Sequence, residues 1–166
     1  MTKMLSEITQ IEDTELSEKY LTFAVDDGVF AINISFVTEI VGMQKINEIP
    51  EAPEYIKGII NLRDKIISII DIRLKLKKAV CQYTERTCIV IVEIQDITIG
   101  LIVDSVNDVV TITDSQIVPP PSFKTGFQNN YLMGIAKAAD KKLFLMLDCE
   151  KLLLDKEIKE ISNIII

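Results

Sequence analysis

Arg63 is the residue of this sequence whose type and position best suit recognition chemistry. It lies in a short polar break, Arg63-Asp64-Lys65, between two apolar runs at 56–62 and 66–72. Apolar runs of this length joined by a short polar break predict a β-hairpin. The hairpin would present the guanidinium of Arg63 at a rigid tip, which suits docking on another protein. By composition alone, the simpler interpretation of Arg63 is an ordinary solvated turn residue.

The residue types that catalysis usually needs are largely missing. The sequence contains no histidine, which removes the usual general base, the histidine-dependent nucleophile pairs and the commonest transition-metal ligand. It contains neither common phosphate-binding glycine loop and no carboxylate pattern typical of a metal loop. We therefore predict no catalytic residue, no metal site and no cofactor. Catalysis by two carboxylates or by a lysine stays formally open, without support from the spacing.

The net charge indicates which class of partner to expect, and the cysteines indicate the cellular compartment. Acidic residues outnumber basic ones, 25 to 18, and the formal net charge is −7. This charge repels phosphate backbones, so we expect protein partners and no nucleic acid. Three cysteines without C-x-x-C spacing, behind an acidic N-terminus, indicate reduced, buried thiols in a cytoplasmic protein. No apolar run approaches the ~18 residues that cross a bilayer, so no direct membrane insertion is expected.

Short strands are predicted along most of the chain. Alternating apolar residues around the turn signal Asp26-Asp27-Gly28 predict a hairpin at 20–34. Residues 75–86 are expected to form a surface connection, and Pro119-Pro120-Pro121 an extended segment. Further strands are expected at 88–94, 97–103, 131–136 and 143–147, with a strand-like or irregular stretch at 106–112 and a helix at 149–161.

One short helix is predicted between the first hairpin and the central one. Ser35 would be its N-cap, and it would end at Val41. Val37, Ile40 and Val41 fall on one side at i, i+3, i+4 spacing, so Thr38 and Glu39 would face outward.

The fold class follows from the strands. The chain holds 29 Ile and 12 Val, stiff side chains that favour strands. The two runs of the central hairpin are nearly all apolar, so they must be covered on both faces. Many short strands with few helices indicate barrels or a sandwich. Ten or so strands are too many for one small barrel, whereas two packed barrels would also explain the double coverage. We predict a mainly β protein behind a flexible acidic tail at 1–18.

The order of these pieces resembles the CheW-like chemotaxis coupling proteins. The likeness covers about 18–155 and includes YLTFAVDDGVFAINISFVTEI, IPEAPEYIKGIINLRDKIISIIDIR, GLIVDSVNDVV, IVPPP, YLMGIAK and LFLMLDCEKLL. It implies two interlocked five-stranded SH3-like barrels with short helices, forming a CheW-like domain at 19–155. A C-terminal tail or helix extension would follow at 156–166.

The resemblance also implies a function. Members of this family are non-enzymatic adaptors that join the cytoplasmic hairpin tip of a chemoreceptor to the regulatory domain of the histidine kinase CheA. This chain would then be cytoplasmic and recruited to membrane-associated receptor arrays.

Ten positions can be carried over as protein-binding residues. They lie in the family's V-x-E-I segment, its N-L-R turn with the preceding lysine, and its G-x-x-V-D-x-V segment near a groove between the barrels. The residues are Val37, Glu39, Ile40, Lys57, Asn61, Arg63, Gly100, Val103, Asp104 and Val106. The family turn is usually N-L-R-G, and here Asp64 replaces the glycine, which puts a carboxylate next to Arg63.

Other interpretations of these residues stay open. Val37, Ile40 and Val106 fit a core as well as an interface, and Asp104 fits a structural carboxylate that caps local backbone. Lys57 fits a solubilising charge. An alternative function is a small-ligand-binding β-barrel sensor module, which predicts a closed apolar pocket with converging polar groups.

Overall fold

The structure is a computed structural model that describes residues 17–76, 78–79, 81–119, 131–153, 158 and 160. The tail predicted at 1–18 lies outside the described residues except for Ser17 and Glu18, which already belong to the first strand. Of the region at 156–166, only residues 158 and 160 are described, and both are helical. Of the three consecutive prolines, only Pro119 is described.

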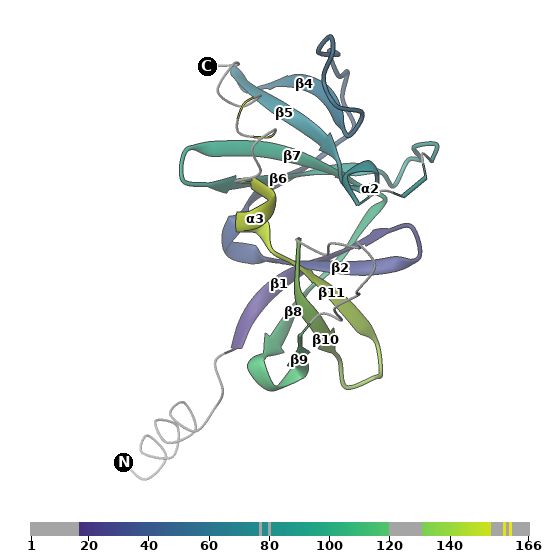
Figure 1. Ribbon diagram of the computed structural model, residues 1–166, viewed down its shortest axis with the longest axis vertical. Coiled ribbons are helices and arrows are strands. Elements are labelled where there is room, and N and C mark those ends of the chain that lie inside the picture. The colour runs from purple at the N-terminus through teal and green to yellow at the C-terminus, as the bar shows by residue number, and fades with distance from the viewer. Residues whose placement is uncertain are drawn as a thin grey trace.

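The described residues form two antiparallel-rich β-sheets, one above the other in Figure 1. The sheet we call barrel 1 has the strand order β8-β1-β2-β11-β10-β9. Its strands are β1 (Ser17–Val25), β2 (Gly28–Asn33), β8 (Ser105–Thr113), β9 (Ile117–Val118), β10 (Leu132–Lys137) and β11 (Leu143–Leu147). The sheet we call barrel 2 has the order β3-β6-β7-β5-β4. Its strands are β3 (Val37–Gly42), β4 (Ile56–Leu62), β5 (Lys65–Asp71), β6 (Cys88–Ile94) and β7 (Ile97–Val103).

Short helical turns connect the strands. A 3₁₀ turn, η1 (Ile34–Phe36), joins β2 to β3, and another, η2 (Asp114–Gln116), joins β8 to β9. The α-helical turns are α2 (Ile72–Lys75), directly after β5, and α3 (Cys149–Leu153), after β11. The prediction of a mainly β protein built from two barrels is therefore confirmed. Barrel 1 has one strand more than the expected five, because the two-residue β9 resumes pairing after η2.

Both sheets curl so that their ends approach each other. In barrel 1 the two end strands, β8 and β9, are consecutive in the chain and separated only by η2. In barrel 2 Asn47, shortly after β3, forms a bridge with Ile59 of the opposite end strand. Gly58 makes this approach possible, because its φ is +142° and a Cβ there would lie 2.1 Å from the Asn47 carbonyl oxygen.

The two barrels are interlocked through the chain path. All of barrel 2 is contained between β2 and β8, so barrel 1 is assembled from the beginning and the end of the described chain. Figure 1 shows this as purple and green-yellow strands in one sheet and blue-teal strands in the other.

Three apolar clusters fill the barrels and the space between them. One cluster lies within barrel 1 and includes Tyr20, Phe144 and Met146. Another lies within barrel 2 and is almost entirely isoleucine. The largest, which we call the junction core, draws residues such as Phe23 of β1 and Leu101 of β7 from both barrels.

Double coverage explains why several strands lack alternation. Ile89 and Ile91 of β6 point into barrel 2, whereas Val90 and Val92 point into the junction core. The prediction of double coverage is confirmed for β5 from Ile67 onward, but β4 alternates between buried and partly exposed residues.

The predicted helix from Ser35 to Val41 is wrong. Only the 3₁₀ turn η1 forms, and its N-cap is Asn33, whose Oδ1 accepts a hydrogen bond from the Ser35 N–H. Residues 37–42 are the strand β3, with alternating half-buried and exposed positions. The β-branched side chains of this segment favour a strand over a helix. A register shift in β3 falls between Val37 and Glu39. Glu39 and Val41 therefore lie opposite Ile91 and Ile89 of the barrel 2 cluster. Val37 and Ile40 lie opposite Val92 and Val90 of the junction core.

The cysteine prediction holds in part. Cys149 is buried, Cys88 is half-buried and Cys81 is exposed, so the expectation that all three thiols are buried is wrong for Cys81. Burial raises the pKa of the Cys149 thiol to about 12, with a smaller contribution from neighbouring carboxylates. Among the described residues, no helix has the length and apolar character to span a membrane.

Candidate protein-docking site

The tip of the β4–β5 hairpin presents Arg63 as the sequence predicted. Leu62 pairs with Lys65, so Arg63 and Asp64 alone form the turn. Their φ angles are +50° and +66°, the left-handed conformation that a type I′ hairpin turn requires at both central residues. Asp tolerates this conformation better than most residues but less well than glycine.

Arg63 forms an ion pair with Glu39, another of the predicted contact residues. The Nη1 atom of Arg63 lies 3.1 Å from Oε2 of Glu39 on β3. The Arg63 side chain is 77% exposed and the Glu39 side chain 27% exposed. The sequence suggested Asp64 as the acidic neighbour of Arg63, whereas the pairing is with a carboxylate from a different strand. We call Glu39, Arg63 and Asp64 the rim of barrel 2.

Apolar residues of the predicted site lie where the junction core reaches the surface. Ile40 is 44% exposed and lies opposite Val90, a residue of the junction core. Val37 and Val106 are partly buried and pack against the same core. The packing of Val37 and Val106 agrees with the core interpretation, whereas Ile40 is exposed. Contact of any of the three with a partner stays a prediction.

The remaining predicted residues fall into two groups. Asn61 on β4 is exposed and lies two residues before Arg63, whereas Lys57, near the beginning of β4, is half-buried. Gly100 and Val103 are buried. A Cβ on Gly100 would lie 2.6 Å from a methyl group of Ile69, so this glycine makes room for the barrel 2 core. Contact of Gly100 or Val103 with a partner stays a prediction.

Asp104 takes part in a polar cluster between the barrels. Its Oδ2 accepts a hydrogen bond of 2.7 Å from the backbone N–H of Asp26, in the β1–β2 turn. The same carboxylate pairs with Nη2 of Arg73, whose Nη1 lies 3.1 Å from Oδ1 of Asp26. Lys78 approaches the other Asp26 oxygen at 3.7 Å. Asp104 is thus a structural carboxylate, but the hydrogen bond that it accepts comes from the backbone N–H of the distant Asp26 and not from its own segment.

Arg73 was not among the predicted site residues. Its side chain is only 9% exposed. Burial opposes its charge, but Asp104 and Asp26 outweigh that penalty, and the pKa of Arg73 is raised. The available signal was a lone arginine directly after the apolar run of β5, in a position where a buried cation requires acidic partners.

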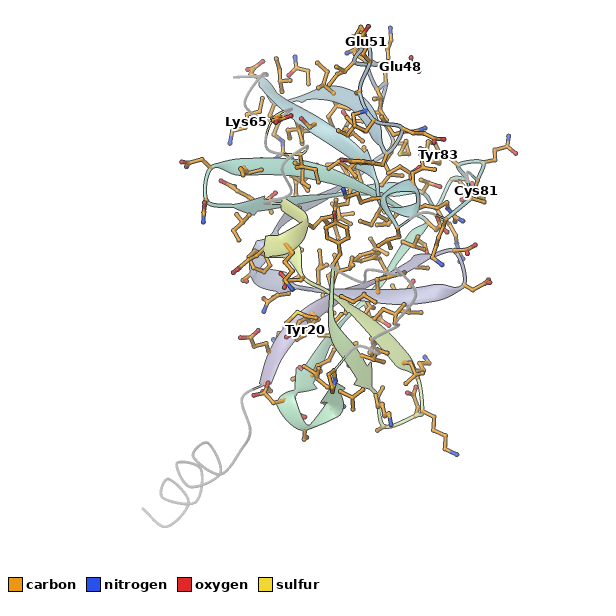
Figure 2. The ribbon with its side chains drawn as sticks, in the orientation of Figure 1. Tyr20, Glu48, Glu51, Lys65, Cys81 and Tyr83 are labelled. Carbon is orange, nitrogen blue, oxygen red and sulfur yellow. The ribbon has the colours of Figure 1, made fainter. Side chains whose placement is uncertain are left out.

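A second polar contact anchors the connection that follows α2. Asp71 is buried and caps α2 by accepting a hydrogen bond of 2.9 Å from the Arg73 N–H. Its other oxygen accepts a 2.9 Å hydrogen bond from the Tyr83 hydroxyl. Burial, with help from the Asp71 carboxylate, raises the pKa of Tyr83. Figure 2 labels Tyr83 and Cys81 on this connection, beside the junction.

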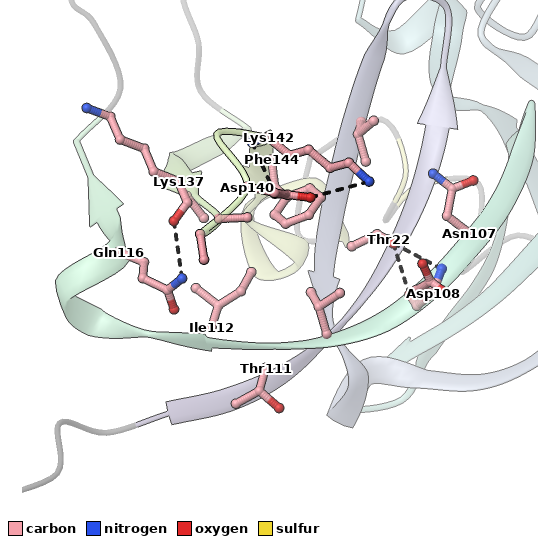
Figure 3. A pocket seen from close by; sticks show the side chains of 15 residues that line it. Thr22, Asn107, Asp108, Thr111, Ile112, Gln116, Lys137, Asp140, Lys142 and Phe144 are labelled. Atoms are coloured by element: carbon pink, nitrogen blue, oxygen red, sulfur yellow. Dashed lines mark hydrogen bonds and ion pairs between the residues drawn. The ribbon is translucent and has the colours of Figure 1, made fainter.

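A pocket of about 480 Å³ lies on barrel 1, but it differs from the closed apolar pocket that a ligand sensor would need. Figure 3 shows its lining, in which polar side chains such as Gln116, Asp140 and Lys142 pair with nearby groups. Gln116 donates a hydrogen bond to the carbonyl oxygen of Lys137, and Lys142 pairs with Asp140. Because packed clusters occupy both barrels, the small-ligand alternative is not supported.

Within the described part of the chain, no group of three or more His, Cys, Asp or Glu side chains is placed to hold a metal ion. The strongest chemical features there are ion pairs and apolar edges. The fold and these features define a domain of two packed β-barrels.

Comparison with known proteins identifies the family. Residues 19–157 match the CheW-like domain. The chain is 31% identical over 160 residues to the chemotaxis protein CheW of Klebsiella aerogenes, covering 96% of each chain. It is 33% identical over 147 residues to the chemotaxis protein CheW of Bacillus subtilis, covering 87% of this chain and 92% of that protein.

A solved structure agrees with these relatives. The crystal structure of the scaffolding protein TtCheW from Thermoanaerobacter tengcongensis matches with a TM-score of 0.74 and 36% identity, covering 80% of this chain and 90% of that one. This chain belongs to the CheW-like family, and it is a chemotaxis adaptor of the scaffold type.

Proposed function

We propose that this chain couples the cytoplasmic tips of chemoreceptors to the regulatory domain of the histidine kinase CheA, and that it does so without catalysing a reaction. Its membership of the CheW-like family supports this function. The structural observation that carries the proposal is the Glu39–Arg63 ion pair, because it brings together at 3.1 Å two residues that the resemblance marks as contacts.

The rim has the physical character of a docking surface. An exposed ion pair contributes only about 0–1 kcal/mol to stability, so either partner can exchange its contact for a charge on another protein at little cost. Ile40 adds an apolar side chain 44% exposed, which suits the apolar face of an amphipathic helix. Val37, Glu39 and Ile40 on β3 would meet the receptor helices, and Arg63 would contribute to signalling contacts.

The proposed surface extends beyond this rim. Lys57 and Asn61 would extend the docking surface along β4. Asp104 and Val106 would extend it to the segment where the chain runs from β7 of barrel 2 to β8 of barrel 1. The kinase domain would meet the outer ends of the barrels. We place the protein in the cytoplasm at membrane-associated receptor arrays, with residues 19–155 as the working domain.

Co-sedimentation tests the proposal. The full chain is mixed with a receptor signalling fragment, with and without CheA, and the pelleted fraction is measured. Arg63→Ala and Glu39→Ala should each weaken the complex about tenfold, as expected when a contact worth roughly 1.4 kcal/mol is lost. Circular dichroism should show that both variants remain folded.

Lys142→Ala is the matched control. Lys142 also forms an exposed ion pair, 3.6 Å from Asp140, but on the β10–β11 hairpin of barrel 1. Its removal should leave sedimentation with the receptor fragment unchanged. Failure of the folded wild-type chain to bind either the receptor fragment or CheA would contradict the proposed function.

A further inference from the structure

The four-residue helix α2 carries two cations that both reach across the boundary between the barrels. Arg73 and Lys75 are two positions apart, so they point about 200° apart around the helix axis. Figure 1 places α2 beside the level where the two sheets meet. Its first residue, Ile72, is fully buried in the junction core, which fixes the helix in place.

The first connection runs through Arg73. Its guanidinium contacts Asp26 in the β1–β2 turn of barrel 1 and Asp104 at the end of β7 in barrel 2. The backbone N–H of Asp104 also donates a 2.9 Å hydrogen bond to the carbonyl oxygen of Ala24. This point is therefore held by directional contacts from both barrels.

The second connection runs through Lys75. Its Nζ lies 4.0 Å from the ring centroid of Tyr55, directly before β4 in barrel 2. It also lies 5.0 Å from the ring centroid of Tyr131, directly before β10 in barrel 1. Both distances fall within the range of a cation–π contact. The ammonium group therefore contacts one ring from each barrel.

We propose that α2 is a clasp that fixes the relative orientation of the two barrels, with the Lys75–Tyr55–Tyr131 cluster as its second fastening point. Two separate directional contacts on one short helix constrain the angle between the barrels more tightly than either contact alone. The aliphatic contacts of the junction core are non-directional. They hold the barrels together, but the directional contacts of Arg73 and Lys75 define the angle.

The clasp can be tested without any partner protein. Residual dipolar couplings of backbone amides are measured for the full chain, and an alignment tensor is fitted to each barrel separately. The wild-type barrels should share one tensor. Lys75→Met keeps an unbranched side chain of similar length but removes its charge, so the barrels should lose their common alignment. The melting temperature should also fall by about 2–4 °C.

Two conservative variants serve as controls. Lys75→Arg keeps a cation that stacks on aromatic rings, and Tyr131→Phe keeps the ring, so both should retain the shared tensor. Tyr131→Leu removes the ring and should behave like Lys75→Met. A wild-type chain that needs two different tensors would overturn the clasp. So would a folded Lys75→Met or Tyr131→Leu chain whose barrels keep the wild-type common alignment.

Discussion

The rim of barrel 2 and the junction between the barrels each contain an arginine paired with acidic side chains. The two arginines nevertheless differ in burial and in the number of their partners. At the rim, Arg63 is 77% exposed and has Glu39 as its ion-pair partner. At the junction, Arg73 is 9% exposed and pairs with both Asp26 and Asp104.

The difference shows that burial and the number of partners decide what an arginine can do. A solvated pair with one contact is worth little and can be exchanged for a contact with another molecule. A desolvated arginine paired with two carboxylates cannot exchange these contacts for others without losing both ion pairs at a large cost in free energy. The rim is therefore suited to exchange with partners, and the junction to structure. Four predictions test this contrast.

The largest effect is expected at the junction. Arg73→Met should lower the free energy of unfolding by about 2–3 kcal/mol, because it removes charged hydrogen bonds to Asp26 and Asp104. Asp104 would lose its ion-pair partner, and Asp26 would keep only the longer contact with Lys78. Urea denaturation followed by circular dichroism measures the change. Arg63→Met is the matched variant and should cost less than about 0.5 kcal/mol. Equal costs for the two substitutions would remove the distinction between the regions.

A smaller effect is expected for the Tyr83 hydroxyl. Tyr83→Phe should cost about 1 kcal/mol at pH 7, because the buried Asp71 carboxylate loses a hydrogen bond. The raised pKa of Tyr83 means that its contribution is fully present below its ordinary value of 10.0 and is lost as the pH rises above it. The stability gap between wild type and Tyr83→Phe should therefore narrow above pH 10. A gap that widens in alkali would contradict this assignment.

The turn at the rim should respond in the opposite direction. Asp64→Gly should raise the free energy of unfolding by about 0.5 kcal/mol, because glycine adopts a positive φ without steric cost, although it adds chain entropy to the unfolded state. Asp64→Ala should instead lower it. Since Arg63 pairs with Glu39, co-sedimentation with the receptor fragment should depend on Arg63 to the same extent in the Asp64→Gly background. A changed dependence would show that Asp64 controls Arg63.

The smallest effect is expected for the rim ion pair itself. A double-mutant cycle of Arg63→Gln and Glu39→Gln should give a coupling energy of about 0.2–0.5 kcal/mol in urea denaturation. The coupling should diminish at high salt, because exposed charges are screened. A value above about 2 kcal/mol would mean that the rim pair is structural, like the one at the junction.

Local signals in the sequence were sufficient for most hairpins. The Asp26-Asp27-Gly28 signal marks a real two-residue turn, in which Val25 pairs with Gly28. The polar break at Arg63 likewise marks the tip between β4 and β5. Such turns depend on residues adjacent in the chain, which is why a single sequence indicates them.

Other features depended on distant parts of the chain. The segment after Ser35 fits helical spacing over seven residues, and only pairing with β6, with a register shift between Val37 and Glu39, makes it a strand. The Glu39–Arg63 pair exists because the barrel closes and brings β3 near the β4–β5 hairpin. Neither closure nor strand order is encoded in a local pattern, so the resemblance could name these two residues but not their contact with each other.

The order in which strands enter the two barrels bears on how the protein is made. Barrel 2 is continuous from β3 to β7, so every one of its strands has left the ribosome once Val103 has emerged. The sheet of barrel 1 cannot form until β8, β10 and β11 have been synthesised, because β1 and β2 pair with strands far away in the sequence. Long-range contacts of this kind slow folding, and we therefore expect barrel 2 to fold first and to serve as the template on which barrel 1 closes.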